Sequence, residues 1–191
     1  MKNYIGRKIN TAIFISGTGS NMRNLIKFSN ANKSPINVKL VISSNKNAKG
    51  IVYASKKKIA NYSFKFSDLK HTEKNIFKIL SEKKIKLICL AGFMKILSHN
   101  FIKKFKGKII NIHPSLLPKY KGLNTYNRVL KNGEKYTGCT VHFVNSKLDG
   151  GKIILQKKIK ILKKDTAISL KKRVQKEEYL LYPRAIKKII N

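Results

Sequence analysis

Acidic residues are scarce in this sequence: 8 Asp and Glu stand against 43 Lys and Arg, a formal net charge of +35. Glycine and proline are also few, at 11 and 4 of 191 residues, and 42% of the chain is hydrophobic, which is typical of a packed globular protein. No apolar run approaches the roughly 18 residues of a membrane span, and the first residues do not form a signal peptide. We therefore expect a cytoplasmic protein with no membrane association.

Cysteine is nearly absent as well. Cys89 and Cys139 lie inside apolar runs, which predicts two buried thiols in a reducing compartment. The histidines and cysteines show no spacing typical of metal ligands, so we predict no metal site. No Gly-x-Ser-x-Gly elbow occurs, which leaves a serine hydrolase unsupported.

The excess of positive charge has two interpretations. A basic surface attracts nucleic acid or anionic lipid through counterion release. However, the lysines are spread along the whole chain, no aromatic pattern suited to base stacking accompanies them, and Lys, Asn and Ile all have codons rich in A and T. We expect no specific nucleic-acid partner, and a field that favours small anionic substrates under either interpretation.

Apolar runs and amphipathic stretches alternate along the chain. This pattern predicts an α/β fold with a doubly wound, mainly parallel sheet and late antiparallel strands, in a single domain over residues 1–191. We predict strands at 8–15, 36–43, 62–66, 86–91, 108–112, 137–144 and 153–161. We predict helices at 20–30, 48–58, 72–83, 98–105 and 127–132, and a last helix from an Asp165 N-cap to about Ile190, interrupted near Pro183. In such sheets ligands bind beyond the carboxyl ends of the strands.

The first strand-end loop contains Gly19, Ser20 and Asn21. Glycine lets the backbone approach an anion closely, and the amides that begin a helix point toward it. As a dinucleotide fingerprint the loop is incomplete, because a third glycine and an acidic residue after the second strand are missing, so we expect no nicotinamide cofactor. A phosphate site is one interpretation, and a turn without a ligand is the other.

Three further segments at strand ends contain residues that suit either a pocket for a flat heterocycle or polar catalysis. The segment 91–97 suits either core packing or the wall of a heterocycle pocket. Asn111 and His113 alternate along one strand, so they point to the same side and suit the stabilisation of an oxyanion, although a lone histidine is also a common structural residue. Asp149 stands in an Asp-Gly turn, where its carboxylate either only closes the turn or also orients a histidine and raises the histidine's pKa.

Together these segments resemble one family. The motifs are SGTGSN at 16–21, AGFMKIL at 91–97, NIHPSLLPKYKG at 111–122 and GCTVHFVNSKLDGG at 138–151. In this order and spacing they are similar to the folate-dependent formyltransferases, from about Lys8 to Ile190. The resemblance implies a Rossmann-like formyltransferase fold, a monomer or homodimer, and transfer of a formyl group from 10-formyltetrahydrofolate to the amine of glycinamide ribonucleotide in purine synthesis, without a metal or NAD.

The resemblance also implies a role for each matched residue. Asn111, His113 and Asp149 would be catalytic, with Asn111 and a protonated His113 donating to the oxyanion and Asp149 keeping the imidazole charged. Gly19, Ser20 and Asn21 would bind the substrate phosphate. The rest of the substrate would contact Pro114, Gln175 and Glu178, and the folate would contact Lys70, Met94, Lys95, Ile96, Leu97, Asn111, Val144 and Asn145. Many members offer an arginine to the folate between Phe64 and Thr72, where this chain has only Lys65 or Lys70.

Three alternatives remain open. The members that formylate methionyl-tRNA share the three catalytic residues but usually carry a C-terminal RNA-binding domain, for which we expect no residues here. The members that hydrolyse formyltetrahydrofolate normally carry an N-terminal regulatory domain, also not expected here. A basic nucleic-acid-binding protein is the third alternative, and a salt titration of duplex binding would test it.

Overall fold

The computed structural model describes residues 8–190. Seven strands form one sheet in the order β3 (Ala60–Ser63), β2 (Ile36–Ser43), β1 (Ile9–Ile15), β4 (Leu87–Leu90), β5 (Lys108–His113), β6 (Tyr136–Phe143) and β7 (Ile153–Lys160). β1 pairs in parallel with β2 and β4, β2 pairs in parallel with β3, and β6 pairs antiparallel with β7. The mainly parallel sheet with late antiparallel strands is therefore confirmed.

The described chain divides into two compact units, one of residues 8–110 with Ile190 and one of Asn111–Ile189. The single domain over residues 1–191 stays a prediction. The strand β5 (Lys108–His113) begins in the first unit and ends in the second.

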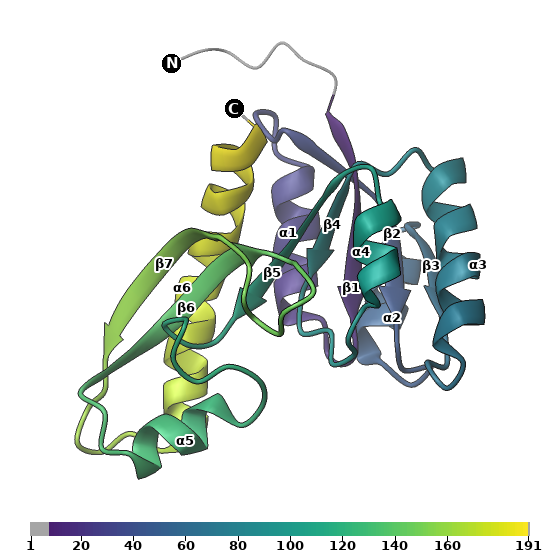
Figure 1. Ribbon diagram of the computed structural model, residues 1–191. Coiled ribbons are helices and arrows are strands. Elements are labelled where there is room, and N and C mark those ends of the chain that lie inside the picture. The colour runs from purple at the N-terminus through teal and green to yellow at the C-terminus, as the bar shows by residue number, and fades with distance from the viewer. Residues whose placement is uncertain (1–7, 191) are drawn as a thin grey trace. The chain divides into compact units, whose positions relative to one another are not determined.

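The first unit contains parallel strands with helices on both faces (Figure 1). On one face, the Phe14 ring of β1 lies 6.5 Å from Phe101 of α4, and Phe101 lies 4.5 Å from Phe77 of α3. On the other face α2 packs closely against β1, since a Cβ built on Gly50 would lie 2.4 Å from Cδ1 of Ile15. The elements of this unit are β1 (Ile9–Ile15), α1 (Ser20–Ser29), β2 (Ile36–Ser43), α2 (Lys49–Lys56), β3 (Ala60–Ser63), α3 (Leu69–Glu82), β4 (Leu87–Leu90) and α4 (His99–Lys104).

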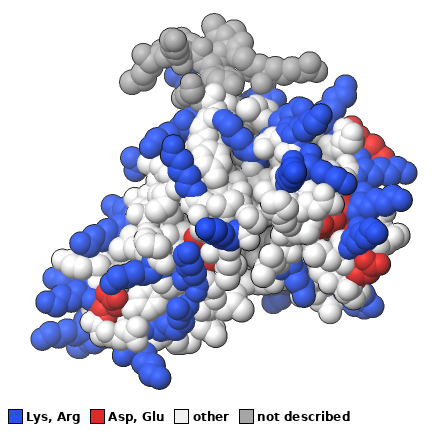
Figure 2. Space-filling model, viewed as in Figure 1, with Lys and Arg blue, Asp and Glu red and all other residues white. Residues whose placement is uncertain are grey.

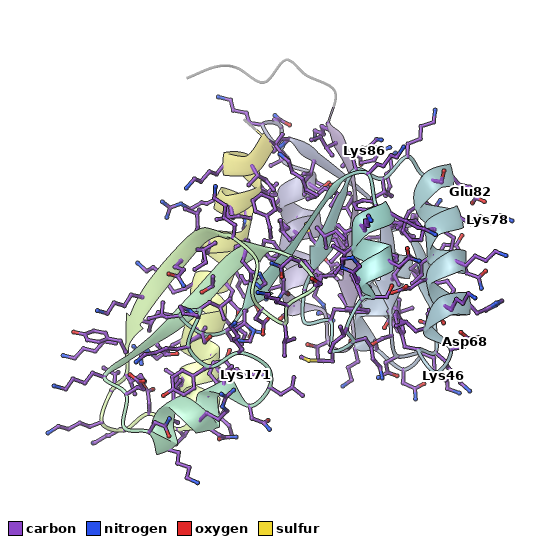
Figure 3. The ribbon with its side chains drawn as sticks, viewed as in Figure 1. Lys46, Asp68, Lys78, Glu82, Lys86 and Lys171 are labelled. Atoms are coloured by element: carbon purple, nitrogen blue, oxygen red, sulfur yellow. The ribbon has the colours of Figure 1, made fainter. Side chains whose placement is uncertain are left out.

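The helix α3 shows how its sequence fixes one buried and one solvent face. Ile76 and Leu80 are buried four residues apart, whereas Lys78 and Glu82 are exposed and point away from the sheet (Figure 3). The α4 N-cap at Ser98 is confirmed, because its side chain accepts a hydrogen bond from the Phe101 amide.

The second unit is built on an antiparallel strand pair and two helices. β6 (Tyr136–Phe143) and β7 (Ile153–Lys160) pair with Thr140 opposite Gln156. The helices are α5 (Thr125–Lys131) and α6 (Ala167–Ile190), whose last residue belongs to the first unit. The predicted edge position of β7 is confirmed, since β7 ends the strand order.

Several predicted boundaries are wrong. α3 begins at Leu69 rather than 72, because Asp68 is its N-cap and accepts a hydrogen bond from the His71 amide, and α5 begins at Thr125 rather than 127. β3 is Ala60–Ser63 rather than 62–66, because its register on β2 starts at Ala60 opposite Leu40. α6 begins at Ala167, after Thr166 accepts a hydrogen bond from the Ser169 amide, while Asp165 instead binds the Ser169 hydroxyl. No interruption occurs at Pro183, which lies inside α6 among buried side chains, so packing outweighs the lost backbone hydrogen bond.

Both cysteines are free and buried, as predicted. No helix within residues 8–190 combines the length and apolar character that crossing a membrane requires. Lys and Arg side chains cover the visible face of the molecule broadly, with only a few acidic side chains between them (Figure 2). The basic charge is therefore a general property of this surface and not of one face of a single element.

Candidate active site

The side chains of His113 and Asp149 contact each other in a buried polar cluster of the second unit. Nδ1 of His113 lies 3.3 Å from Oδ2 of Asp149, and each side chain is 8% exposed. His113 ends β5, and Asp149 lies in the turn between β6 and β7, in a left-handed conformation with φ 46°. Two residues 36 positions apart thus meet away from solvent, where their electrostatic interaction is strong.

Asn111 lies on the same strand as His113 and contacts the same carboxylate, that of Asp149. Its Nδ2 lies 3.4 Å from Oδ1 of Asp149 and 3.2 Å from Nε2 of His142. Strand alternation predicts that Asn111 and His113 share a side, and both contact Asp149. The structure therefore brings Asn111, His113 and Asp149 together.

His142 is a member of this cluster that the sequence interpretation missed. Its Nδ1–H donates to the carbonyl of Phe143 at 2.8 Å, which leaves Nε2 as an acceptor for Asn111. Nε2 also lies 3.6 Å from Oδ1 of Asp149. One signal was available: His142 lies within the matched motif at 138–151, near the end of a predicted strand.

Two backbone groups of the loop that follows β5 complete the cluster. Nε2–H of His113 donates to the carbonyl of Tyr120 at 2.9 Å, and the amide of Gly122 donates to Oδ2 of Asp149 at 2.9 Å. Both nitrogens of His113 therefore face acceptors, and the Asp149 carboxylate receives a fixed donor. The residue types of this loop do not predict these two contacts, because backbone atoms make them.

The pKa values of the pair follow from burial and from these contacts. Burial lowers the pKa of His113 below its ordinary value, and the Tyr120 carbonyl and Asp149 only partly oppose this effect. Burial alone would raise the pKa of Asp149, but the neighbouring His142 imidazole, the hydrogen bond from the Gly122 amide and the His113 imidazole lower it overall. Asp149 raises the His113 pKa, which is the direction expected of it, but burial outweighs this effect in the protein without substrate. That Asp149 keeps the imidazole charged during the reaction stays a prediction.

These directions predict lower stability in acid. The unfolded chain binds more protons than the folded one as the pH falls through the ordinary values of 6.5 for His113 and 3.8 for Asp149. The free energy of unfolding should therefore decrease below pH 6.5 and again below pH 3.8. Urea unfolding at several pH values measures it. His113→Asn should flatten the first decrease, and a wild-type protein that gains stability between pH 7 and pH 5 through His113 would contradict the assignment.

In the first unit, Ser16 connects the loops at the carboxyl ends of three strands. Its amide donates to the Gly92 carbonyl at 3.1 Å, and its hydroxyl lies 2.6 Å from the Ser44 hydroxyl and accepts from the Met94 amide at 2.8 Å. The loops after β1, β2 and β4 are thus held together at the sheet edge where ligands are expected.

The predicted phosphate loop begins α1. Gly19 has φ 71°, and a Cβ there would lie 2.9 Å from Cε of Met22 and 3.2 Å from Cα of Gly50. Glycine is therefore required at position 19 both for its backbone conformation and for the close approach of α2. Ser20 and Asn21 form the first turn of α1, where helix amides attract anions, and this turn holds no acidic residue.

Four of the predicted folate residues of the first unit, at 94–97, follow one another in the segment after β4. Met94 and Ile96 are 61% and 71% exposed, whereas Leu97 is buried; Lys95, between them, is exposed. The ring of Phe66 lies 5.4 Å from that of Phe93, so the segment before α3 packs beside the 93–97 segment. Lys70, which is exposed, stands in the first turn of α3.

The remaining predicted residues belong to the second unit. Val144 and Asn145 follow β6 and lead toward Asp149, and Asn145 holds this turn by donating to the Gly150 carbonyl at 3.3 Å. Pro114 directly follows His113. Gln175 and Glu178 lie one turn apart on α6, and the buried Glu178 is close enough to raise the pKa of Tyr126 and Cys139, each of which burial raises most.

Comparison with known proteins identifies the family. Residues 9–186 match the family model described as formyl transferase. The chain belongs to the formyl transferase family. The match includes every predicted site residue of both units.

Named members of the formyl transferase family resemble the chain over most of its length. It is 42% identical to phosphoribosylglycinamide formyltransferase of Haemophilus influenzae, over 92% of this chain and 84% of that protein. It is 38% identical to the human trifunctional purine biosynthetic protein adenosine-3 over 94% of this chain, but spans only 18% of that protein. The crystal structure of phosphoribosylglycinamide formyltransferase from Brucella melitensis superposes with a TM-score of 0.91 at 42% identity, covering 96% of each chain.

The chemistry of the cluster suits a formyl transferase. An amide, an imidazole and a carboxylate converge, which can stabilise an oxyanion and move a proton. Among residues 8–190, no group of three His, Cys, Asp or Glu side chains is arranged to hold a metal ion.

Proposed function

We propose that this protein transfers the formyl group of 10-formyltetrahydrofolate to the amine of glycinamide ribonucleotide. The observation that carries the proposal is the convergence of Asn111 and His113 on the buried carboxylate of Asp149, in a chain 42% identical to a phosphoribosylglycinamide formyltransferase. The reaction is a direct acyl transfer. The amine attacks the formyl carbon, and a tetrahedral oxyanion forms. The bond to N10 of the folate then breaks as N10 gains the proton that the amine gives up, and the C=O double bond re-forms.

His113 contributes through its Nε2–H. In the structure this group donates to the Tyr120 carbonyl, and the substrate oxyanion is a stronger acceptor that would replace it. The developing negative charge favours the imidazolium form, so the low pKa of His113 in the free protein would rise as the intermediate forms. Asp149 stabilises that form through Nδ1 and accepts none of the substrate's protons directly.

Asn111 contributes an amide donor on the same side. Its two amide hydrogens serve Nε2 of His142 at 3.2 Å and Oδ1 of Asp149 at 3.4 Å. The longer contact is the weaker, so we propose that the oxyanion takes over this hydrogen. His142 then holds the other hydrogen and fixes the orientation of the amide.

The substrates are proposed to bind at the predicted strand-end segments. The amides of Gly19, Ser20 and Asn21 would hold the phosphate of glycinamide ribonucleotide, supported by the start of α1. The pterin would lie against the exposed Met94 and Ile96, whose side chains offer apolar surface. Pro114, Gln175 and Glu178 are proposed to contact the rest of the ribonucleotide. Lys70, Lys95, Leu97, Val144 and Asn145 are proposed to complete the folate contacts.

Two further properties belong to the proposal. A cytoplasmic location is supported by the two free cysteines, because buried thiols persist in a reducing compartment. A monomer or homodimer is the proposed assembly.

An acceptor comparison tests the proposal. The protein is mixed with 10-formyltetrahydrofolate and glycinamide ribonucleotide, methionyl-tRNA or no acceptor, and release of tetrahydrofolate is followed by absorbance. We expect rapid release with glycinamide ribonucleotide alone. Equal release without an acceptor would indicate hydrolysis instead, and release only with methionyl-tRNA would assign the other branch of the family.

A further inference from the structure

The loop of residues 114–124 contacts both His113 and Asp149, through two residues that lie two positions apart. The Tyr120 carbonyl accepts from His113, and the Gly122 amide donates to Asp149, each at 2.9 Å. A displacement of this short segment would therefore change the environments of the imidazole and the carboxylate together.

This segment has a backbone conformation that needs support. Tyr120 has φ 56°, in the left-handed region that residues with a side chain adopt at a cost of about 1 kcal/mol or more. Gly122 follows with φ 77°. A tyrosine in this conformation persists where its side chain makes compensating contacts.

The side chain of Tyr120 makes such contacts at both its ring and its hydroxyl. The hydroxyl donates to Oε1 of Glu134 at 2.9 Å and accepts from Nδ2 of Asn132 at 3.0 Å. The guanidinium of Arg128 lies 5.4 Å from the ring centroid and donates to the Lys121 carbonyl at 2.6 Å. Tyr120 is thus attached to the C-terminal part of α5 and the turn after it.

The first half of the loop has a separate support. The Thr140 hydroxyl donates to the Ser115 carbonyl at 2.6 Å and accepts from the Leu117 amide at 3.1 Å. Nε2 of Gln156 donates to the Leu117 carbonyl at 2.8 Å. The strands β6 and β7 therefore fix residues 115–117. The half of the loop that contacts His113 and Asp149 is held instead by the Tyr120 side chain and by Arg128, which donates to the carbonyls of Lys121 and Leu123.

We infer that Tyr120 is a positioning residue, whose hydroxyl, bound to Glu134 and Asn132, holds its own carbonyl against Nε2 of His113 and so sets the protonation and tautomer of that imidazole. The inference rests on the proposed function for its effect on catalysis, but not for its effect on His113. The carbonyl raises the His113 pKa, so loosening it lowers that pKa and shifts the tautomer away from Nε2–H.

The test removes the hydroxyl and keeps the ring. Tyr120→Phe preserves the Arg128 contact. Tyr136→Phe is a matched control, because Tyr136 is exposed and carries Lys158 over its ring. The His113 titration is followed by NMR of isotope-labelled histidine, with His113→Asn identifying the resonance among the four histidines. We expect a lower His113 midpoint in Tyr120→Phe and an unchanged midpoint in Tyr136→Phe.

Activity gives an independent readout. In Tyr120→Phe, kcat should fall roughly threefold to tenfold, the effect of weakening the one hydrogen bond from His113 to the Tyr120 carbonyl, with KM for both substrates unchanged. Glu134→Ala should lower the His113 midpoint as Tyr120→Phe does. Glu134→Gln should bring the midpoint most of the way back to the wild-type value, because the amide oxygen still accepts from the Tyr120 hydroxyl. Circular dichroism checks that each variant folds. A wild-type His113 midpoint in both Tyr120→Phe and Glu134→Ala would overturn the inference. A shifted midpoint in a protein without formyl transfer would support it while refuting the proposed function.

Discussion

Asp149→Asn is expected to lower kcat at least about 10²-fold, the effect typical of losing one stabilising group around an oxyanion. The carboxylate contacts His113 at 3.3 Å and Asn111 at 3.4 Å and accepts from the Gly122 amide at 2.9 Å. An amide at position 149 can still accept from Gly122, but it has no charge with which to stabilise the imidazolium. Steady-state formyl transfer at saturating substrates measures the loss.

The matched control for this prediction is Glu82→Gln. It makes the same change from carboxylate to amide on the solvent face of α3, where Glu82 points away from the sheet (Figure 3). We expect its kcat to equal that of the wild type. A normal kcat in Asp149→Asn would remove the carboxylate from the mechanism, and an equal loss in both variants would indicate a general effect of charge.

The second large effect is expected at Gly151, which follows the Asp149 turn. A Cβ at this position would lie 1.7 Å from the carbonyl oxygen of Phe143. Gly151→Ala therefore pushes the backbone at residue 151 away from that of Phe143, in the connection from β6 to β7. We expect a loss of about 3 kcal/mol in the free energy of unfolding, at the upper end for added volume in a packed region. Activity should fall with it, because the displaced turn carries Asp149.

Thermal unfolding measures this loss, which corresponds to a Tm roughly 6–12 °C lower for a chain of this size. Gly17→Ala is the control, since a Cβ there meets nothing within 4 Å and Gly17 does not have a positive φ. The wild-type Tm in Gly151→Ala would show that the close approach to Phe143 does not exist in solution. A Tm loss in Gly17→Ala as large as that in Gly151→Ala would remove the specific explanation.

The sequence predicted those parts of the site that depend on local periodicity. Alternation along one strand placed Asn111 and His113 on one side, and the strand-helix order placed Gly19 and the 91–97 segment at the carboxyl ends of strands. These predictions succeed because a buried parallel strand has a recognisable apolar pattern and a fixed side-chain period.

The remaining features depend on contacts that no local pattern encodes. The acceptor of the His113 imidazole is a backbone carbonyl at Tyr120, and any residue type carries such a carbonyl. The net direction of the His113 pKa depends on burial, which becomes known only once the chain is folded. At Pro183, a strong local signal for a break is overridden by the burial of neighbouring side chains such as Tyr182 and Ala185.

Transfer of an isotopic label tests the central claim most directly. The protein is mixed with glycinamide ribonucleotide and 10-formyltetrahydrofolate whose formyl carbon is ¹³C, and the product is followed by carbon NMR. Formyl transfer predicts that the label appears as a formamide carbon on glycinamide ribonucleotide, and far more slowly when His113→Asn replaces the wild type. Label that stays on the folate, or that appears as free formate, would contradict the account.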